Sequence, residues 1–421
     1  MILLENLDSY VDYTYDFIET ICEDFGPRYS GSEAEDKANK WIKEKWSKFC
    51  DETNIEEFKV HPHFYPQGVL RMVFALGVFS FLMLPLKYPF SIFASVIILL
   101  GMLVYFFEFM LLKGILKFLY KKKTSSNVFG IIKPREETKC RVILDGHTDS
   151  AKELHIGKIN NRFYEVILYS NLLVYGFFVL IYSIVKVSLQ SSSVDHLVSY
   201  NWFIFELTKF DLYIIPIIFV LLILYIIFFL GVIYGKTVMG ANDNLSGTAV
   251  AAAVGKYFSK NRLKNVELII VSTGSEEIGE RGAYHFVRNN PELFQDSLSL
   301  VYECIGAGKV IVIVEEDYMH LARYSQEVVS RFVKAYEIYR KQNEDAIPCT
   351  RGKLLMGSSN ANIYVKAGYE SAFIIGVRDE SWKPVNWHTL QDTIECIDKK
   401  FLNDVIGISL CFVKLIDEEY S

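Results

Sequence analysis

The stretch "CRVILDGHTDS", Cys140 to Ser150, is a short apolar run followed at once by polar residues that can act as ligands. A continuous apolar run of this length is typical of a strand buried on both faces of a sheet. In open α/β sheets, ligands bind just beyond the carboxyl ends of the strands. We therefore expect His147 and Asp149, which directly follow this strand, to belong to a functional site.

Similar apolar runs alternate with helical stretches along the polar parts of the chain. This order predicts an α/β fold with a mixed, largely parallel sheet and helices on both sides. Helices are expected over 32–49, with Ser32 as N-cap, and over 245–259 and 325–341. The predicted strands are "NVFGIIKP" (127–134), "CRVILDG" (140–146), "NVELIIVST" (265–273), "SLSLVYECIG" (297–306), "KVIVIVEE" (309–316) and "SAFIIGV" (371–377).

The chain is more apolar than a typical soluble protein, because 51% of its 421 residues are hydrophobic and 15% are aromatic. Four apolar runs of about 20 residues explain much of this excess, and each predicts a transmembrane helix. The runs come in two pairs, so the chain returns to its starting side after each pair. The four predicted helices cover residues 69–86, 90–112, 164–185 and 212–234.

Two hairpins of this kind leave all the polar segments on one face of the membrane. We therefore expect these segments to fold together as one discontinuous domain. The predicted parts are a discontinuous domain of residues 1–67, 118–163 and 235–421, a first transmembrane hairpin at 68–117 and a second at 164–234.

The charge pattern predicts that the discontinuous domain faces the cytoplasm, because basic residues near the span ends are concentrated on its side. The N-terminus lacks a secretory signal, and the seven cysteines form no CxxC pair, which also favours a reducing compartment. The net charge of -6 argues against a nucleic-acid partner. The basic residues counted are Arg71, Lys113, Lys117, Lys121, Lys122, Lys123, Lys158, Arg162 and Lys236 on this side, and Lys87, Lys186 and Lys209 on the other.

Residues with ligand chemistry also follow the other predicted strands. Glu276 and Glu277 come shortly after "LIIVST", and Glu303 follows "SLVY". Asp243 in "GANDN" and His388 in "NWHTLQDT" complete a set of imidazoles and carboxylates without thiolates. Such a set suits zinc, or a harder divalent ion such as manganese, in a catalytic rather than a structural site.

The order of these motifs is specific. An HxD motif is followed by a "GAxDNxSG" turn, by "EE" with glycine-rich sequence after it, by an acidic residue two positions before "IG", and by a late "HTxxDT". This order resembles the co-catalytic zinc aminopeptidases and glutamate carboxypeptidases of metallopeptidase clan MH. The segments "GPRYSGSEAEDKANKWIKEKW" and "GSSNANIYVKAGYESAFI" resemble that family as well. The resemblance runs from about Asp16 to Cys396 and is interrupted by the predicted hairpins.

The resemblance implies a pair of divalent metal ions, with zinc as the expected metal, and a zinc-exopeptidase-like fold. In that arrangement Asp243 bridges the two ions. His147 and Glu303 complete one metal site, and Glu277 and His388 complete the other. The discontinuous domain would then be the catalytic domain.

The resemblance also implies the residues that act beside the metals. Glu276 is the expected general base, Asp149 is expected to orient His147, and Asp392 is expected to act near His388. Glu303 stands where aminopeptidases of this family usually have aspartate. The 95 residues between His147 and Asp243 (148–242) replace a short loop of the family.

The implied function is an integral membrane, zinc-dependent exopeptidase, most simply an aminopeptidase, which hydrolyses terminal residues of peptides with a metal-bridging water. Its partners would be a peptide substrate and the lipid bilayer, with the metals near the cytoplasmic membrane surface. The alternatives are a carboxypeptidase, a glutaminyl cyclase with one metal, a noncatalytic membrane scaffold or receptor with this fold, and a transporter built from the four helices. Few polar residues lie inside the predicted spans, which argues against a transporter.

Overall fold

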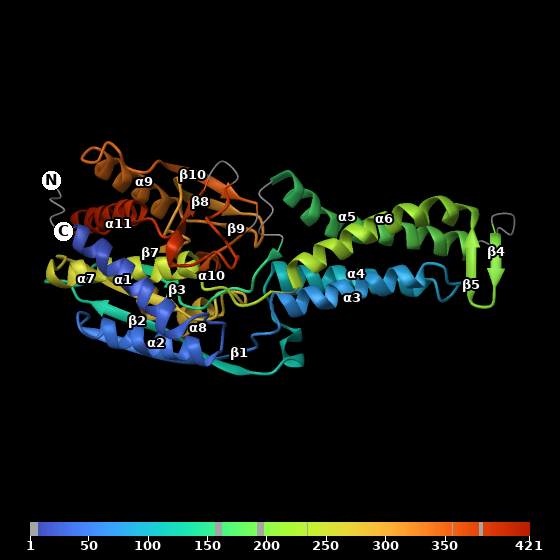
Figure 1. Ribbon diagram of the computed structural model, residues 1–421, viewed down its shortest axis with the longest axis horizontal. Helices are drawn as coiled ribbons and strands as arrows, with labels where there is room; N and C mark the ends of the chain where they lie inside the picture. Colours follow the sequence, from blue (N-terminus) through green and yellow to red (C-terminus); the bar gives the residue numbers. More distant parts are fainter. Residues whose placement is uncertain (1–6, 156–161, 192–197, 234, 356, 379–381) are drawn as a thin grey trace. The chain divides into compact units, whose positions relative to one another are not determined.

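The structure, a computed structural model, describes residues 7–155, 162–191, 198–233, 235–355, 357–378 and 382–421. The chain forms two compact units (Figure 1), and each is described by itself. Unit 1 contains Met1–Pro62, Lys121–Glu153 and Lys236–Ser421, and unit 2 contains His63–Tyr120 and Leu154–Gly235. Lys158, one of the basic residues in the predicted topology, lies outside the described residues.

A mixed sheet forms the centre of unit 1. Its strands are β1 (Glu52–Val60), β2 (Lys123–Ile132), β3 (Cys140–His147), β6 (Val266–Thr273), β7 (Ser297–Glu303), β8 (Val310–Asp317), β9 (Ala322–Arg323), β10 (Cys349–Leu354) and β11 (Glu370–Val377). The order across the sheet is β1-β2-β6-β3-β7-β11-β8-β10, with β9 beside β8. The four central strands, β6, β3, β7 and β11, run parallel, whereas β1, β2 and β8 introduce antiparallel pairs. The predicted α/β class with a mixed, largely parallel sheet is confirmed.

All six predicted strands are present, as β2, β3, β6, β7, β8 and β11. Three strands of this sheet were not predicted: β1 and β10 lie at its two edges, and the two-residue strand β9 pairs with β8. Edge strands face water on one side, so they carry charged residues such as those of "EEFK" in β1 and lack the continuous apolar runs that mark central strands.

Helices cover both faces of the sheet. They are α1 (Leu7–Phe25), α2 (Glu33–Trp46), α7 (Ser246–Lys260), α8 (Arg281–Asn289), α9 (Gln326–Arg340), α10 (Asn360–Lys366) and α11 (Lys399–Glu419), with short turns η5 (Ala241–Leu245), η6 (Pro291–Phe294) and η7 (Ile394–Cys396). Helices α1, α2, α7, α9 and α11 pack on one face, and α8 and α10 pack on the other. Sequence patterns predicted α2, α7 and α9.

Local residues explain where these helices begin and how closely they approach the sheet. The hydroxyls of Ser32 and Ser325 accept hydrogen bonds from the first-turn amides of α2 and α9, as N-caps do. Residues 249–253 of α7, "AVAAA", are fully buried. Their small side chains let α7 lie close to β3, β6 and β7, directly behind the predicted site.

Unit 2 is built mainly from apolar helices. Its elements are α3 (Gln67–Met83), α4 (Ile92–Val104), which continues as the π-helix η1 (Tyr105–Met110), η2 (Leu116–Leu119), α5 (Arg162–Ser191), β4 (Val198–Trp202), β5 (Phe205–Thr208) and α6 (Lys209–Ile233). Helix α3 packs on α4, α4 on α5, α5 on α6, and α6 also contacts α3. The four helices therefore form a bundle.

Three helices of the described chain are long and apolar enough to cross a membrane: Ile92–Met110, Ser170–Ser191 and Lys209–Gly231. The prediction of four such helices in two hairpins was wrong for the first run. Helix α3 has 17 residues and ends at Met83, whereas the predicted helix continued to residue 86. Proline at position 85 has no amide hydrogen to donate to the preceding turn, and its ring clashes with the carbonyl of that turn, so the helix stops early.

The bundle exposes apolar side chains and buries polar ones. Phe177 and Ile181 of α5 are 52% and 62% exposed. Ser80 of α3 is fully buried, and its hydroxyl donates to the carbonyl of Ala94 in α4 at 2.7 Å. This distribution is the reverse of that in a helix bundle that folds in water.

Lys186, counted in the sequence as a basic residue at a span end, is buried in an ion pair. Its Nζ lies 2.9 Å from Oδ2 of Asp211 and donates to the carbonyls of Leu84 and Glu206. The amide of Thr208 donates to the same carboxylate at 2.7 Å. One ion pair thus joins α5, α6, β5 and the end of α3.

Candidate metal centre

The sheet brings the carboxyl ends of three neighbouring parallel strands together. His147 is the last residue of β3, and Glu303 is the last residue of β7. Glu276 and Glu277 lie in the turn that follows β6, the other neighbour of β3. These side chains therefore converge at one edge of the sheet, as expected for a site in an open α/β fold.

Asp243 reaches the same place from the η5 turn that precedes α7. The backbone amides of Asn242 and Asp243 donate to the two carboxylate oxygens of Asp392, at 2.7 and 3.1 Å. The side-chain amide of Asn244 donates to the carbonyl of Tyr302 in β7 at 2.6 Å. The turn is thus held from both sides. Asp392, expected near His388, makes these hydrogen bonds to the Asp243 turn.

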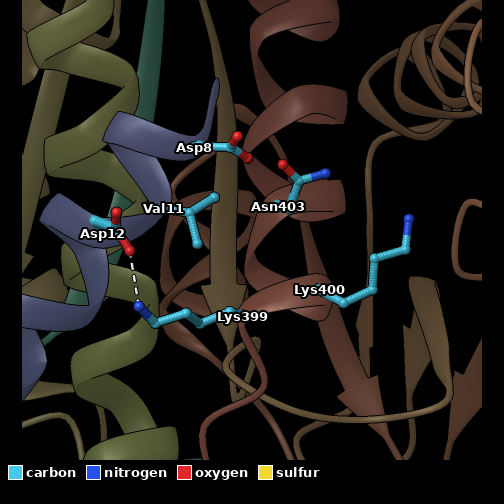
Figure 2. Close-up of a pocket in the computed structure, with 6 residues that line it drawn as sticks. All are labelled: Asp8, Val11, Asp12, Lys399, Lys400 and Asn403. Atoms are coloured by element: carbon cyan, nitrogen blue, oxygen red, sulfur yellow. Dashed lines mark hydrogen bonds and ion pairs between the residues drawn. The ribbon is translucent and has the colours of Figure 1, made fainter. Parts of the chain in front are cut away.

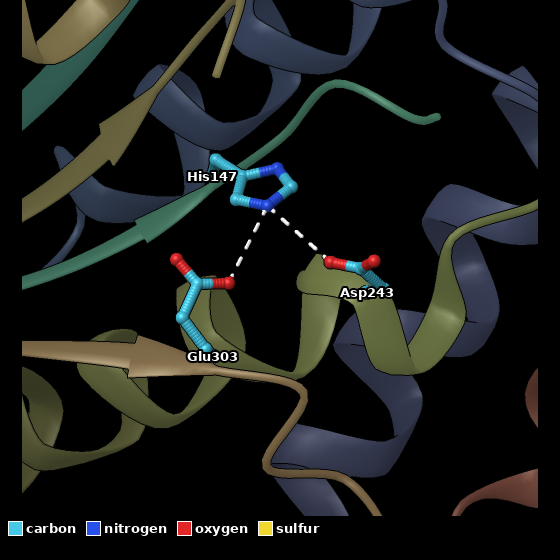
Figure 3. A group of neighbouring side chains, drawn as sticks. All are labelled: His147, Asp243 and Glu303. Atoms are coloured by element: carbon cyan, nitrogen blue, oxygen red, sulfur yellow. Dashed lines mark ion pairs between the residues drawn. The ribbon is translucent and has the colours of Figure 1, made fainter. Parts of the chain in front are cut away.

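The two oxygens of Asp243 face two different histidines. Oδ1 lies 3.4 Å from Nε2 of His147, and Oδ2 lies 3.2 Å from Nε2 of His388. Glu303 places Oε2 at 3.7 Å from Nε2 of His147, and Figure 3 shows this trio. Glu277 places Oε2 at 3.2 Å from Nε2 of His388. The Asp243 carboxylate thus lies between two imidazoles, and each imidazole has one further carboxylate beside it. This arrangement is suited to binding two cations.

Two observations test whether these residues fit metal ions. In each group, His147–Asp243–Glu303 and Asp243–Glu277–His388, the possible ligand atoms all lie within 4.8 Å of one another. In addition, Oε1 of Glu277 and Oε1 of Glu303 are buried without a hydrogen-bond partner among the described residues. Buried polar atoms are almost always paired, and a bound cation would supply a partner for these two oxygens. The residues fit two divalent ions.

Both imidazoles turn Nε2 toward the carboxylates. Nδ1 of His147 lies 3.1 Å from the carbonyl of Asp149, so it can carry the proton and leave Nε2 as a ligand atom. The ring of Trp387 stacks on that of His388, with centroids 4.2 Å apart and an angle of 26°. Both ligand rings are therefore held in one orientation.

The electrostatics of the centre reflect an excess of carboxylates. Burial alone would lower the pKa of His388, but Glu277 and Asp243 raise it to about 10. Burial likewise opposes the charge on His147, yet Glu276 and Asp243 raise its pKa well above the usual value. Divalent cations in the centre would offset the same negative charge.

Glu276 lies beside the ligand groups. Its Oε2 is 3.6 Å from Nε2 of His147, and its side chain is 13% exposed, more than that of Glu277 or Asp243. Burial raises the pKa of Glu276 well above its usual range, and the carboxylate of Glu303 adds to this against the attraction of His147. A carboxyl group with a raised pKa next to a metal site can accept and return a proton near neutral pH.

Asp149 holds the turn that carries the two glutamates. Its Oδ1 and Oδ2 accept hydrogen bonds from the amides of Glu276 and Glu277, at 2.8 and 3.2 Å, and Ser30 donates to Oδ2 at 2.6 Å. The Asp149 carboxylate is 3.6 Å from Nδ1 of His147, farther than the carbonyl of the same residue. The orienting role expected for the Asp149 carboxylate stays a prediction, whereas its hydrogen bonds to the turn are present in the structure.

Sequence reasoning missed two buried charged residues that support the centre, Arg28 and Glu35. Glu35 accepts from the amide of Ser275, next to Glu276, at 3.1 Å, and from Gly31 at 2.6 Å. Glu35 occurs in a predicted helix with many exposed charges, so nothing in the sequence separates it from them. The structural role of Glu35 depends on its burial, which only the folded structure shows.

A hollow of about 480 Å³ lies elsewhere on unit 1, between α1 and α11 (Figure 2). Its charges are opposite in sign, and Lys399 pairs with Asp12 at 2.7 Å. It contains none of the predicted site residues. The hollow is lined by Asp8, Val11, Asp12, Lys399, Lys400 and Asn403.

The fold and the centre together define a metal-dependent hydrolase. Residues 229–413 match the sequence family described as peptidase family M28, and this segment includes Asp243, Glu276, Glu277, Glu303 and His388. The chain thus carries a peptidase family M28 domain, and the protein is a metallopeptidase. The clan expected from the motifs is confirmed.

Solved structures of this class share the fold. BSAP, a zinc aminopeptidase from Bacillus subtilis, is similar with a TM-score of 0.55 at 14% identity, over 96% of this chain and 95% of that chain. A glutaminyl cyclase from Bacteroides thetaiotaomicron gives a TM-score of 0.55 at 14% identity, over 96% and 97%. An aminopeptidase from Aneurinibacillus sp. strain AM-1 has a TM-score of 0.52 at 14% identity, over 96% of this chain and 93% of that chain. At these identities the likeness concerns the fold alone. No curated protein matches the chain.

Proposed function

We propose that the protein is a membrane-anchored exopeptidase with two zinc ions, and specifically an aminopeptidase. The observation that carries this proposal is Asp243, whose two oxygens face His147 and His388 at 3.4 and 3.2 Å. In this proposal Asp243 would hold both ions, one together with His147 and Glu303 and the other together with Glu277 and His388.

The chemistry follows from the residues of the centre. Two bound divalent cations would polarise the scissile carbonyl and lower the pKa of a water molecule. Glu276 takes the proton from the attacking water and returns it to the leaving amine, the work of a general base that becomes a general acid. The backbone amide of Glu276 donates a hydrogen bond to the Asp149 carboxylate at 2.8 Å, and this bond keeps Glu276 in place. Nε2 is the atom that His147 and His388 would each offer to a metal ion.

A peptide-library digestion with mass-spectrometric readout tests the proposal. We expect the wild-type protein to remove residues successively from the amino terminus. The Glu276→Gln variant keeps the size of the side chain but cannot accept the proton, so it should bind zinc and cleave at least about 100-fold more slowly. Glu344→Gln, at an exposed position, is the control and should cleave like wild type.

The outcomes of this digestion separate the alternatives. Loss of residues from the carboxyl terminus would assign a carboxypeptidase. Cyclisation of N-terminal glutamine with one zinc per chain would assign a glutaminyl cyclase, and a solved enzyme of that kind has a similar fold. No reaction on any peptide, with zinc bound, would favour a noncatalytic scaffold or receptor.

We also propose that unit 2 lies in a lipid bilayer and that unit 1 is the catalytic domain on its cytoplasmic side. Three long apolar helices and the exposed apolar surface of the bundle support this placement. Because β1 pairs with β2, and β3 with β6, each insertion of unit 2 must return the chain to the side it left. In the first insertion, α3 is shorter than the three long apolar helices and packs on α4.

Cysteine labelling with a membrane-impermeant reagent tests this topology. Tyr88, in the turn between α3 and α4, is 50% exposed, so Tyr88→Cys should react only from the side opposite the catalytic unit. Lys37→Cys on α2, with 59% of the lysine side chain exposed, should react only from the cytoplasmic side. Reaction of both from one side would reject the topology. That the metals lie near the membrane surface stays a prediction.

A further inference from the structure

Arg28 is fully buried in unit 1, and its guanidinium donates only to backbone carbonyls among the hydrogen bonds described for it. Nε donates to Thr148 at 2.9 Å, and Nη1 donates to Gly26 at 2.6 Å. Nη2 donates to Met239 at 2.9 Å and to Gly240 at 3.3 Å. These hydrogen bonds offset the cost of burying the charge, and they also tie together the segments that supply the carbonyls.

The carbonyls that Arg28 joins belong to the two segments that carry metal ligands. Thr148 directly follows His147, and Met239 and Gly240 shortly precede Asp243. The planar guanidinium reaches both segments at once because its donors point in different directions from one rigid group. A lysine ammonium has its donors at one point and cannot span the same carbonyls.

Ser150 reinforces the same junction. The amide of Arg28 donates to the hydroxyl of Ser150 at 3.2 Å, and the amide of Ser150 donates to the carbonyl of Arg28 at 3.0 Å. The Ser150 hydroxyl in turn donates to the carbonyl of Met239 at 3.2 Å. The segment after β3, the segment before η5 and Arg28 therefore form one hydrogen-bonded unit.

The junction lies where the chain leaves unit 1 for unit 2 and returns. The amide of Val238 donates to the carbonyl of Ala151 at 3.0 Å, and the amide of Glu153 donates to the carbonyl of Lys236 at 2.8 Å. His147 and Asp243 are separated by 95 residues (148–242), so contacts between neighbours in the sequence cannot bring these two ligands together. Closing a longer loop costs more conformational entropy, so contacts at the base of the loop must hold its ends together.

We propose that Arg28 is a positioning residue that fixes the spacing of His147 and Asp243, and thereby the zinc affinity of the centre. The inference rests on the metal centre assigned above. It does not depend on which peptides, if any, the protein cleaves.

The experiment measures zinc binding by the full chain in detergent, in competition with a chromogenic chelator. We expect Arg28→Lys, which keeps the charge, and Arg28→Met, which removes it, to weaken zinc binding by about 10- to 100-fold, as other supporting residues of metal ligands do. Ser150→Ala removes only one bridge and should weaken it by a smaller factor. Arg262→Lys, at a 30% exposed ion pair with Asp51, is the control.

A second readout separates positioning from a loss of fold. With Co²⁺ in place of zinc, altered ligand spacing should shift the visible absorption of the bound ion in the Arg28→Lys and Ser150→Ala variants, while their metal-free melting temperatures stay close to wild type. Wild-type zinc affinity and an unchanged spectrum in these variants would overturn the inference. If the wild-type protein binds zinc but cleaves no peptide, the proposed function fails and the inference remains.

Discussion

The carboxylate of Asp149 holds the turn with Glu276 and Glu277 through two backbone amides, at 2.8 and 3.2 Å. In Asp149→Asn only one oxygen remains, and the new amide group faces the second backbone N–H. An unsatisfied buried donor costs about 1–3 kcal/mol, and loss of a residue that supports ligands typically costs about 10- to 100-fold in affinity or activity. We therefore expect kcat/KM for peptide hydrolysis to fall by about 10- to 100-fold.

The matched control is Asp12→Asn, since Asp12 is an exposed aspartate that pairs with Lys399 at 2.7 Å. Steady-state kinetics and melting temperature are measured together for both variants. A turnover rate for Asp149→Asn equal to that of the control would show that the turn keeps its shape without this carboxylate.

At the scale of residues, the sequence was informative where chemistry directly follows a buried strand. His147 and Glu303 could be named because each ends an apolar run and because the motifs occur in a recognisable order. Arg28 and Glu35 could not be named, since their importance lies in burial and in partners such as Thr148 and Ser275. Those partners are more than 100 positions away in the sequence, and no local pattern records them.

At the scale of elements, the ion pair of Lys186 and Asp211 joins the helices of unit 2. Breaking a buried pair by removing one partner typically costs about 3–5 kcal/mol, because the other charge is left uncompensated. Lys186→Met should therefore loosen the bundle at this end. The double variant Lys186→Met with Asp211→Leu removes both charges and should recover part of the loss.

Resistance of unit 2 to limited proteolysis in detergent measures this effect, with Lys209→Met as the control at an exposed position. A single variant as resistant as wild type would mean that the pair adds nothing to the bundle. The sequence could not predict the pair, because Lys186 and Asp211 are 25 positions apart and each resembles an ordinary charge at a span end. The central strands were easier to predict, since each carries its own apolar signal.

At the scale of the whole molecule, the predicted α/β part is confirmed and three of the four predicted long apolar helices are present, whereas the division into a discontinuous domain and two hairpins stays a prediction. The sequence-based prediction placed the end of the first apolar helix at residue 86, because hydropathy continues past the proline at position 85, whereas α3 ends at Met83. The pairing of distant segments into one sheet, such as β1 with β2 across the first insertion, needed three-dimensional structure.

Metal removal tests how far the centre stabilises unit 1 as a whole. The ligands come from segments of the chain as far apart as β3 and the loop with His388, so bound zinc should resist unfolding of the entire unit. A ligand that binds only the folded state at about 100 times its Kd adds roughly 2.7 kcal/mol per site. We expect chelation to lower the melting temperature by on the order of 5–10 °C.

Added zinc should restore the melting temperature, and it should do so in Glu276→Gln as well, because that residue is not assigned as a ligand. His388→Ala should abolish part of the restoration, since it removes a ligand of only one ion. If chelator left the melting temperature of zinc-loaded protein unchanged, the metals would not join these segments, and Asp243 would not be their bridge.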